Sequence, residues 1–195
     1  MKRIAIVAAA ASFAFAGQAF AQAQNFAGFQ VGASVDLVSG KNTGSSGQTD
    51  STSQSTANLG LTAQYNWALG ESWVLGAGAS IQAVDNKFGE WTNETAKLKN
   101  AYSAFAVVGY AKGTNLYYGK LASVGGSGEL SGIVNQSKTV SGTGLGFGLQ
   151  SNINKNVLWN AELMFSQYDK QTYPNATGQL QPTSSTVSFG IAYKF

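Results

Sequence analysis

The last nine residues, Val187-Ser188-Phe189-Gly190-Ile191-Ala192-Tyr193-Lys194-Phe195, alternate between two kinds of side chain. Every odd position is apolar or aromatic, and every even position is small or polar. Successive side chains of a β-strand point to opposite faces, so this pattern predicts a strand with one apolar and one polar face.

The same alternation recurs upstream in segments of about ten residues, the length of a tilted transmembrane strand. We expect seven further strands, over 29–37, 59–67, 73–82, 98–110, 115–124, 143–150 and 157–166. Long polar connections (39–56, 85–97, 125–141, 169–184) alternate with short ones (68–72, 111–114, 153–156). This layout predicts an all-β fold: an eight-stranded antiparallel up-and-down transmembrane β-barrel with its short turns at the periplasmic rim.

Residues 1–21 have the features of a cleavable signal peptide. Lys2 and Arg3 precede an apolar, Ala-rich run over 4–17, and Ala19-Phe20-Ala21 has the small-x-small pattern of a cleavage site. A membrane anchor is the alternative, but the run is shorter than the roughly 20 apolar residues that span a bilayer. We expect cleavage after Ala21, export through the periplasm and a single mature domain, 22–195.

Composition excludes several classes of function. Without Lys2 and Arg3, ten basic side chains remain against nine acidic ones, a net charge of +1, and no Arg is left to form a nucleic-acid-binding face. The chain has no Cys and no His, which removes thiolate metal sites, the Ser-His-Asp arrangement and the usual imidazole base. We expect no enzyme activity, no cofactor and no metal site, and we interpret the acidic loop residues Asp85, Glu90 and Glu94 as solvated rather than as Ca²⁺ ligands.

Two features indicate that the apolar face of each strand contacts lipid rather than a soluble ligand. Most charged residues fall in the predicted loops and turns, and a Lys at the middle of a bilayer costs about 2–4 kcal/mol. Aromatic residues gather at strand ends beside the short turns, where an interfacial girdle is expected. The predicted girdle consists of Trp67, Trp73, Tyr110, Trp159 and Tyr193. Ordinary strand propensity of aromatic residues is the alternative explanation.

The C-terminal segment 188–195 has the polar-x-Gly-x-x-aromatic-x-aromatic pattern and resembles the assembly signal of outer-membrane barrels, carried by Gly190, Tyr193 and Phe195. With Tyr117-Tyr118-Gly119-Lys120 and Asn160-Ala161-Glu162, each following a short turn, the mature chain resembles the small OmpX/OmpW-type family of outer-membrane barrels. The resemblance implies contact with outer-membrane lipid and lipopolysaccharide, assembly by the barrel-assembly machinery, and a monomer without nucleic-acid partners. Lipid A-modifying barrels of this size use a His that this chain lacks.

The alternation places four ionisable side chains inside the barrel as a polar network: Asp36, Lys99, Lys120 and Glu162. A buried charge without a partner is costly, so we expect an ion pair between Lys120 and Glu162. This network could be a gate or narrow ion path, but a structural plug is the interpretation we favour, because eight strands leave room for side chains rather than a channel.

The predicted function is that of an outer-membrane barrel of the porin type, with a structural role or limited passage of small solutes. A surface adhesin that acts through its long loops is the alternative. A soluble secreted barrel that carries an apolar ligand is a third interpretation.

Overall fold

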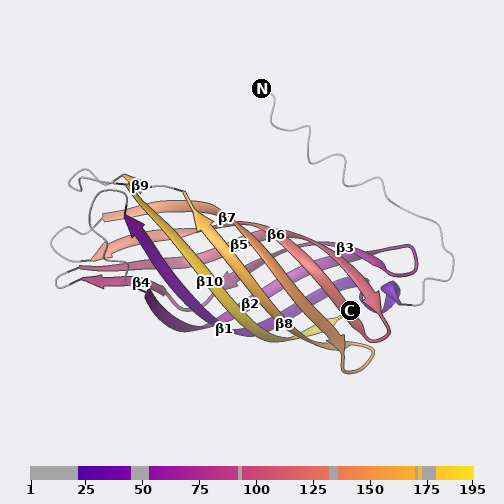
Figure 1. The fold of residues 1–195 in the computed structure, drawn as a ribbon. Coiled ribbons are helices and arrows are strands. Elements are labelled where there is room, and N and C mark those ends of the chain that lie inside the picture. The colour runs from indigo at the N-terminus through magenta and orange to yellow at the C-terminus, as the bar shows by residue number, and fades with distance from the viewer. Residues whose placement is uncertain (1–21, 45–52, 92–93, 132–135, 170, 173–178) are drawn as a thin grey trace.

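A single antiparallel β-sheet, closed on itself, makes up the fold in the computed structural model (Figure 1). The structure describes residues 22–44, 53–91, 94–131, 136–169, 171–172 and 179–195. One short 3₁₀ helix, η2 (Ala23–Asn25), precedes the strands. The strands are β1 (Gly28–Gly44), β2 (Ser53–Leu69), β3 (Trp73–Gln82), β4 (Asn86–Trp91), β5 (Glu94–Lys112), β6 (Asn115–Ser131), β7 (Gln136–Asn152), β8 (Val157–Tyr168), β9 (Gln171–Thr172) and β10 (Gln179–Lys194).

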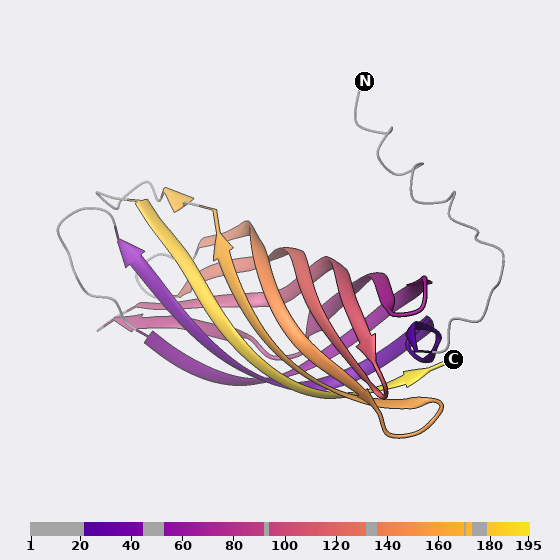
Figure 2. The same cartoon turned by 45° about the vertical axis from the view of Figure 1, so that its right-hand side comes forward.

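The wall of the barrel is eight strands around. Each strand pairs antiparallel with the next along the chain, and β10 pairs with β1, which closes the sheet (Figure 2). The two shortest strands do not add to the circumference, because β4 continues β3 beside β5 and β9 continues β8 beside β10. The predicted eight-stranded up-and-down barrel is confirmed.

The strands are longer than predicted, and the expectation of long loops over 39–56, 85–97, 125–141 and 169–184 is wrong for much of their length. The ladder between β1 and β10 continues to Gly44 and Leu180, and that between β5 and β6 continues to Thr95 and Ser131. The outward side chains of these extensions are polar, Lys41 and Ser141 among them, so the extensions lack the alternation on which the prediction depended. Backbone hydrogen bonding continues there without an apolar outer face, although Val140 is buried inside.

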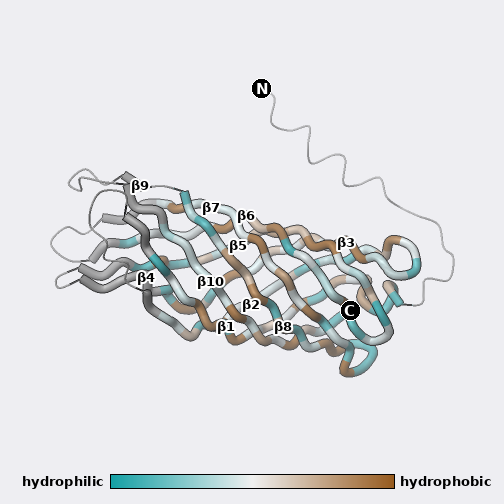
Figure 3. Tube along the Cα trace, viewed as in Figure 1, coloured by the Kyte–Doolittle hydropathy of each residue, from teal (hydrophilic) through white to brown (hydrophobic). Residues whose placement is uncertain are grey.

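The outer face of the wall is an apolar band of exposed hydrophobic side chains. Figure 3 shows that hydrophobic and hydrophilic residues alternate along the strands. Phe189 and Ile191 of β10 are each 59 % exposed, Leu61 of β2 is 52 % exposed, and Phe147 of β7 is 56 % exposed. The intervening side chains point inward. An apolar outer face with a partly polar interior is the reverse of a soluble ligand carrier, and this excludes the third interpretation.

The rim with the short turns (70–72, 113–114 and 153–156) also holds η2 and the end of β10 (Figure 1). Gly70 and Gly113 have positive φ angles of 70° and 62°, which these tight connections require and which glycine adopts without strain.

No helix in the described residues is long and apolar enough to cross a membrane.

Candidate functional site

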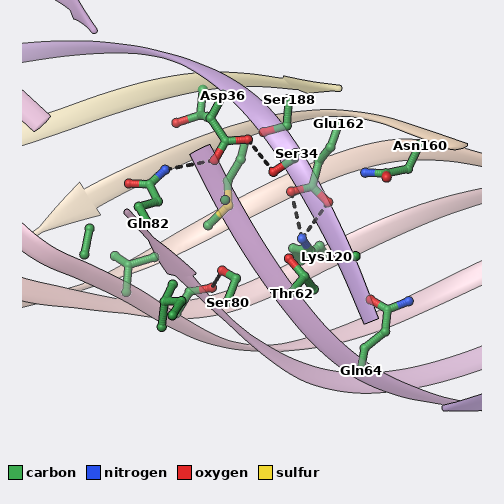
Figure 4. A pocket seen from close by; sticks show the side chains of 18 of the residues that line it. Ser34, Asp36, Thr62, Gln64, Ser80, Gln82, Lys120, Asn160, Glu162 and Ser188 are labelled. Carbon is green, nitrogen blue, oxygen red and sulfur yellow. Dashed lines mark hydrogen bonds and ion pairs between the residues drawn. The ribbon is translucent and has the colours of Figure 1, made fainter. Parts of the chain in front are cut away.

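The lumen of the barrel is the candidate site. It contains a cavity of about 130 Å³ to which all wall strands contribute side chains. Many of these side chains are polar: Gln30, Ser34, Asp36, Thr62, Gln64, Ser80, Gln82, Lys120, Asn160, Glu162 and Ser188. Figure 4 shows that the side chains it labels, Asp36, Lys120 and Glu162 among them, point into the interior from different strands.

The short-turn end of the lumen is closed by the segment that precedes β1. Phe26 is completely buried there and packs in an apolar cluster with Val74, Leu116 and Leu158, each at most 1 % exposed. The segment is held in place by a backbone hydrogen bond from the Ala23 N–H to the Glu71 carbonyl, 3.0 Å long. We call residues 22–27 the N-terminal stopper.

A layer of amide side chains lies directly above the stopper. Gln30 donates through Nε2 to the Phe26 carbonyl at 2.9 Å, and its Oε1 accepts hydrogen bonds from Gln64 at 3.1 Å and Gln150 at 3.0 Å. Asn66 donates to the same Phe26 carbonyl at 3.1 Å. The layer therefore links strands β1, β2 and β7 to one another and to the stopper through hydrogen bonds.

Lys120 and Glu162 form the ion pair that their placement predicted (Figure 4). The Lys120 Nζ lies 2.7 Å from one Glu162 oxygen and 2.6 Å from the other, and the side chains are only 12 % and 9 % exposed. Tyr118 donates its hydroxyl to Glu162 at 2.8 Å, and the Phe105 ring centroid lies 4.2 Å from the Lys120 Nζ. Both charges are thus fully engaged, which is the arrangement that makes a buried pair tolerable.

Asp36 belongs to a second polar group, on the strands opposite Lys120. Its carboxylate accepts hydrogen bonds from Ser34 Oγ at 2.8 Å and Gln82 Nε2 at 3.2 Å. A hydrogen-bond chain continues from Gln82 to Asn86 and from Asn86 to Asn58, which joins β3, β4 and β2. Asp36 is 5 % exposed and, within the described part of the chain, forms no ion pair.

Lys99 is not part of this network, so its predicted inward position needs correction. A β-bulge between Lys99 and Tyr102 shifts the pairing of β5 with β6 by one residue, and the inward side chain above it is Leu98 rather than Lys99. Lys99 instead pairs with Glu129 at 2.7 Å, with 37 % of its side chain exposed. A bulge moves every side chain beyond it to the other face.

The interior is also less polar than expected. On the β5–β8 side, beyond the ion pair, the lumen is filled by an apolar cluster of eight buried residues: Leu98, Ala101, Phe105, Val107, Ala122, Val124, Val140 and Tyr168. The alternation in the sequence does not predict a cluster of this extent. The polar half of the lumen therefore lies mainly on β1, β2, β3 and β10.

The five predicted girdle residues all point outward near the short-turn rim, with exposures of 38 % to 54 %. Trp73 and Tyr110 lie on paired strands with ring centroids 5.4 Å apart. Tyr193 and Phe195 are also in ring contact, at 5.0 Å. Their roles as a membrane girdle and assembly signal stay predictions.

Gly190, the third residue of the predicted assembly signal, has a structural constraint of its own. A Cβ at this position would lie 2.6 Å from Asn160 Oδ1 and 2.8 Å from the Ala33 carbonyl oxygen. Ala33 belongs to β1, so Gly190 lies at the seam where the barrel closes.

The sequence pattern missed Phe26 and the three glutamines of the amide layer as members of the site. Gln30, Gln64 and Gln150 occupy polar positions in the alternation, and their inward position could have been inferred from it. Phe26 precedes the first strand, and no periodicity marks it. The side chains of Glu90 and Glu94 lie outside the described part of the chain.

Comparison with known proteins decides the family. The model of the outer membrane protein beta-barrel domain matches residues 6–195. The chain belongs to this outer-membrane β-barrel family. It is therefore an integral protein of the bacterial outer membrane, and the apolar band is its lipid-facing surface. No curated protein sequence matches it.

Solved structures of other outer-membrane barrels share the fold. Ail, the attachment invasion locus protein of Yersinia pestis, is similar with a TM-score of 0.55 and 16 % identity, over 87 % of this chain and 99 % of Ail. Neisserial surface protein A has a TM-score of 0.52 and 18 % identity, over 87 % of this chain and 98 % of that protein. At these identities the likeness shows a common outer-membrane barrel architecture.

Proposed function

We propose that this outer-membrane barrel is monomeric and non-enzymatic, has a structural role in the membrane, and permits at most slow passage of small polar solutes. The observation that carries the proposal is the filled lumen. The N-terminal stopper, the amide layer and the Lys120–Glu162 pair occupy successive levels of it, and each is held by hydrogen bonds or by an ion pair. A solute has to displace these groups to cross, and the paired charges resist displacement.

The proposal includes the route to the membrane. Residues 1–21 are removed during export, the barrel-assembly machinery recognises the segment 188–195, and lipopolysaccharide surrounds the outer half of the wall. The proposed recognition segment lies on β10, which pairs with both β8 and β1 and so closes the sheet.

Solute entry into liposomes that contain the refolded protein tests the function. We expect slow uptake of the smallest polar solutes, exclusion of larger ones, and no resolved single-channel steps in planar bilayers. Clear, reproducible conductance steps would contradict a filled lumen, because they require a continuous aqueous path. The assay uses the mature chain, residues 22–195, because the proposed signal peptide is not part of the barrel.

Surface attachment is a second candidate function, favoured by the polar extension of the strands beyond the apolar band. In this extension the Lys99–Glu129 pair lies on the outer face of the β5–β6 hairpin and is open to solvent. Ail, which shares the fold, is named for attachment. Cells that display the barrel should then adhere to a host surface, and deletion of residues 44–55 should abolish adhesion if the β1–β2 connection carries it. Unchanged adhesion would count against that connection.

A further inference from the structure

Asp36 is a carboxylate buried in the lumen without a positive charge beside it. Its Oδ1 accepts a hydrogen bond from Ser34 and its Oδ2 one from Gln82, and both donors are neutral. Each oxygen of a carboxylate can accept a further hydrogen bond or bind a cation. Isolated charges are costly to bury in a protein interior.

The groups that face Asp36 from the surrounding strands do not supply the missing charge. In register with it lie Asn58 of β2 and Ser188 of β10, and Asn86 of β4 reaches it through Gln82. Lys120, which lines the same cavity, has both of its close contacts on Glu162. Among the described residues that line the cavity, two carboxylates therefore face a single ammonium group.

The space beside Asp36 suits a small ion. The cavity of about 130 Å³ is bordered there by hydroxyl and amide groups of Ser34, Ser80 and Gln82. Gly60 keeps the position open, because a Cβ at residue 60 would lie 2.8 Å from Asp36 Oδ2 and 2.5 Å from Ser34 Oγ. Oxygen atoms of carboxylate, hydroxyl and amide groups are the ligands that hard cations prefer.

We propose that the lumen binds one monovalent alkali cation at the Asp36 carboxylate, with the Ser34 hydroxyl oxygen as a neighbouring ligand and water completing the shell, while the Gln82 NH₂ group keeps its hydrogen bond to the carboxylate. The charge balance selects the valence. One univalent cation neutralises the excess carboxylate, whereas a divalent cation would leave an uncompensated positive charge. The inference goes beyond the proposed passage role, because an ion can occupy this site in a barrel that conducts nothing.

The test measures binding of Tl⁺, a spectroscopic substitute for K⁺, by ²⁰⁵Tl NMR. The protein is the mature chain folded in detergent micelles. The wild-type protein should bind Tl⁺, and excess K⁺ or Na⁺ should displace it. Asp36→Asn should lose binding, whereas Glu71→Gln, which removes an exposed carboxylate at the short-turn rim, should retain it. The heat-dependent shift in gel migration shows independently that each variant is folded.

A second readout is the thermal unfolding midpoint at constant ionic strength. Chloride salts of Na⁺ or K⁺ should raise the midpoint of the wild-type protein relative to N-methyl-D-glucamine, a cation too large for the cavity, and Asp36→Asn should lose this difference. Absence of Tl⁺ binding by folded wild-type protein would overturn the inference, and so would stabilisation by Ca²⁺ alone. Tl⁺ binding by a protein that also gives clear single-channel conductance steps would contradict the proposed filled lumen and leave the cation site standing.

Discussion

Glu162 stabilises the lumen because it compensates the buried charge of Lys120. Glu162 neutralises Lys120 and also accepts the Tyr118 hydroxyl, so Glu162→Gln leaves a buried ammonium group without its counter-charge. Loss of one partner of a buried pair costs about 3–5 kcal/mol, and we expect a destabilisation of that order. Urea unfolding in phospholipid vesicles, followed by tryptophan fluorescence, measures it.

The matched control for this prediction removes both charges together. Lys120→Met combined with Glu162→Gln should recover part of the lost stability, because no unpaired charge remains in the lumen. A single Glu162→Gln variant as stable as the wild-type protein would show that the pair is solvated rather than buried.

The variant Gly190→Ala distinguishes a steric role of Gly190 from a role in recognition by the assembly machinery. The Ala33 carbonyl lies too close for a Cβ, so Gly190→Ala should hinder seam closure even when no assembly machinery is present. Overpacking of this kind costs about 1–3 kcal/mol. The measurement is the yield of the heat-shifted, folded band after refolding into pure lipid vesicles.

Tyr193→Ala is the control for Gly190→Ala, since Tyr193 lies in the same β1–β10 ladder but its ring is 48 % exposed on the outer face, where its removal creates no clash. It should refold with nearly the wild-type yield in the same assay. If Gly190→Ala also refolded normally, Gly190 would act only through recognition by the machinery.

At the scale of elements, the N-terminal stopper is the part that decides how tightly the lumen is closed. Phe26→Ala removes a completely buried ring from the cluster with Val74 and Leu158, which costs about 3–5 kcal/mol for a core aromatic side chain. It also opens the short-turn end to water. We expect faster uptake of small solutes by liposomes together with a lower unfolding midpoint.

Phe29→Ala provides the comparison for the stopper variant. Phe29 lies three residues further along but points outward from β1, with 44 % of its surface exposed. Its removal should leave solute uptake unchanged. Equal uptake by the Phe26→Ala variant and the wild-type protein would mean that the amide layer, not the stopper, sets the barrier.

The wall strands could be predicted from the sequence because one face of each strand contacts lipid and the other faces the lumen. This requires a strict alternation of apolar residues with small or polar ones, as in 187–195. The strand extensions could not be predicted, because their outer faces carry polar residues and contact water in place of lipid, so the strict alternation disappears. Lys99 was misplaced because nothing in its local sequence identifies a bulge. Phe26 was missed because its position follows from contacts with residues far along the chain, such as Leu116 and Leu158.

At the scale of the whole molecule, the apolar band determines where charge is tolerated. Leu61, in the middle of the outer face of β2, should contact hydrocarbon, and Leu61→Lys should cost about 2–4 kcal/mol in a bilayer. Ser55 is exposed on the same strand beyond the band. Ser55→Lys should therefore be close to neutral.

The free energies of unfolding of both lysine variants and of the wild-type protein, measured in vesicles, give the cost of a charge at residue 61 and at residue 55. Equal costs at residues 55 and 61 would place the bilayer elsewhere on the wall. The same assay in detergent micelles, which adapt to the protein surface, should reduce the difference.

The pairing of β1 with β10 has a kinetic consequence. Asp36 and Ser188, for example, are partners separated by most of the mature chain. Contacts between such distant segments form late and slowly, because the intervening loop entropy opposes them. Until they form, β1 and β10 each expose an unsatisfied edge that invites intermolecular pairing. An unfinished copy of this protein is consequently an aggregation hazard, and its survival in the cell depends on shielding those two edges until the circle is complete.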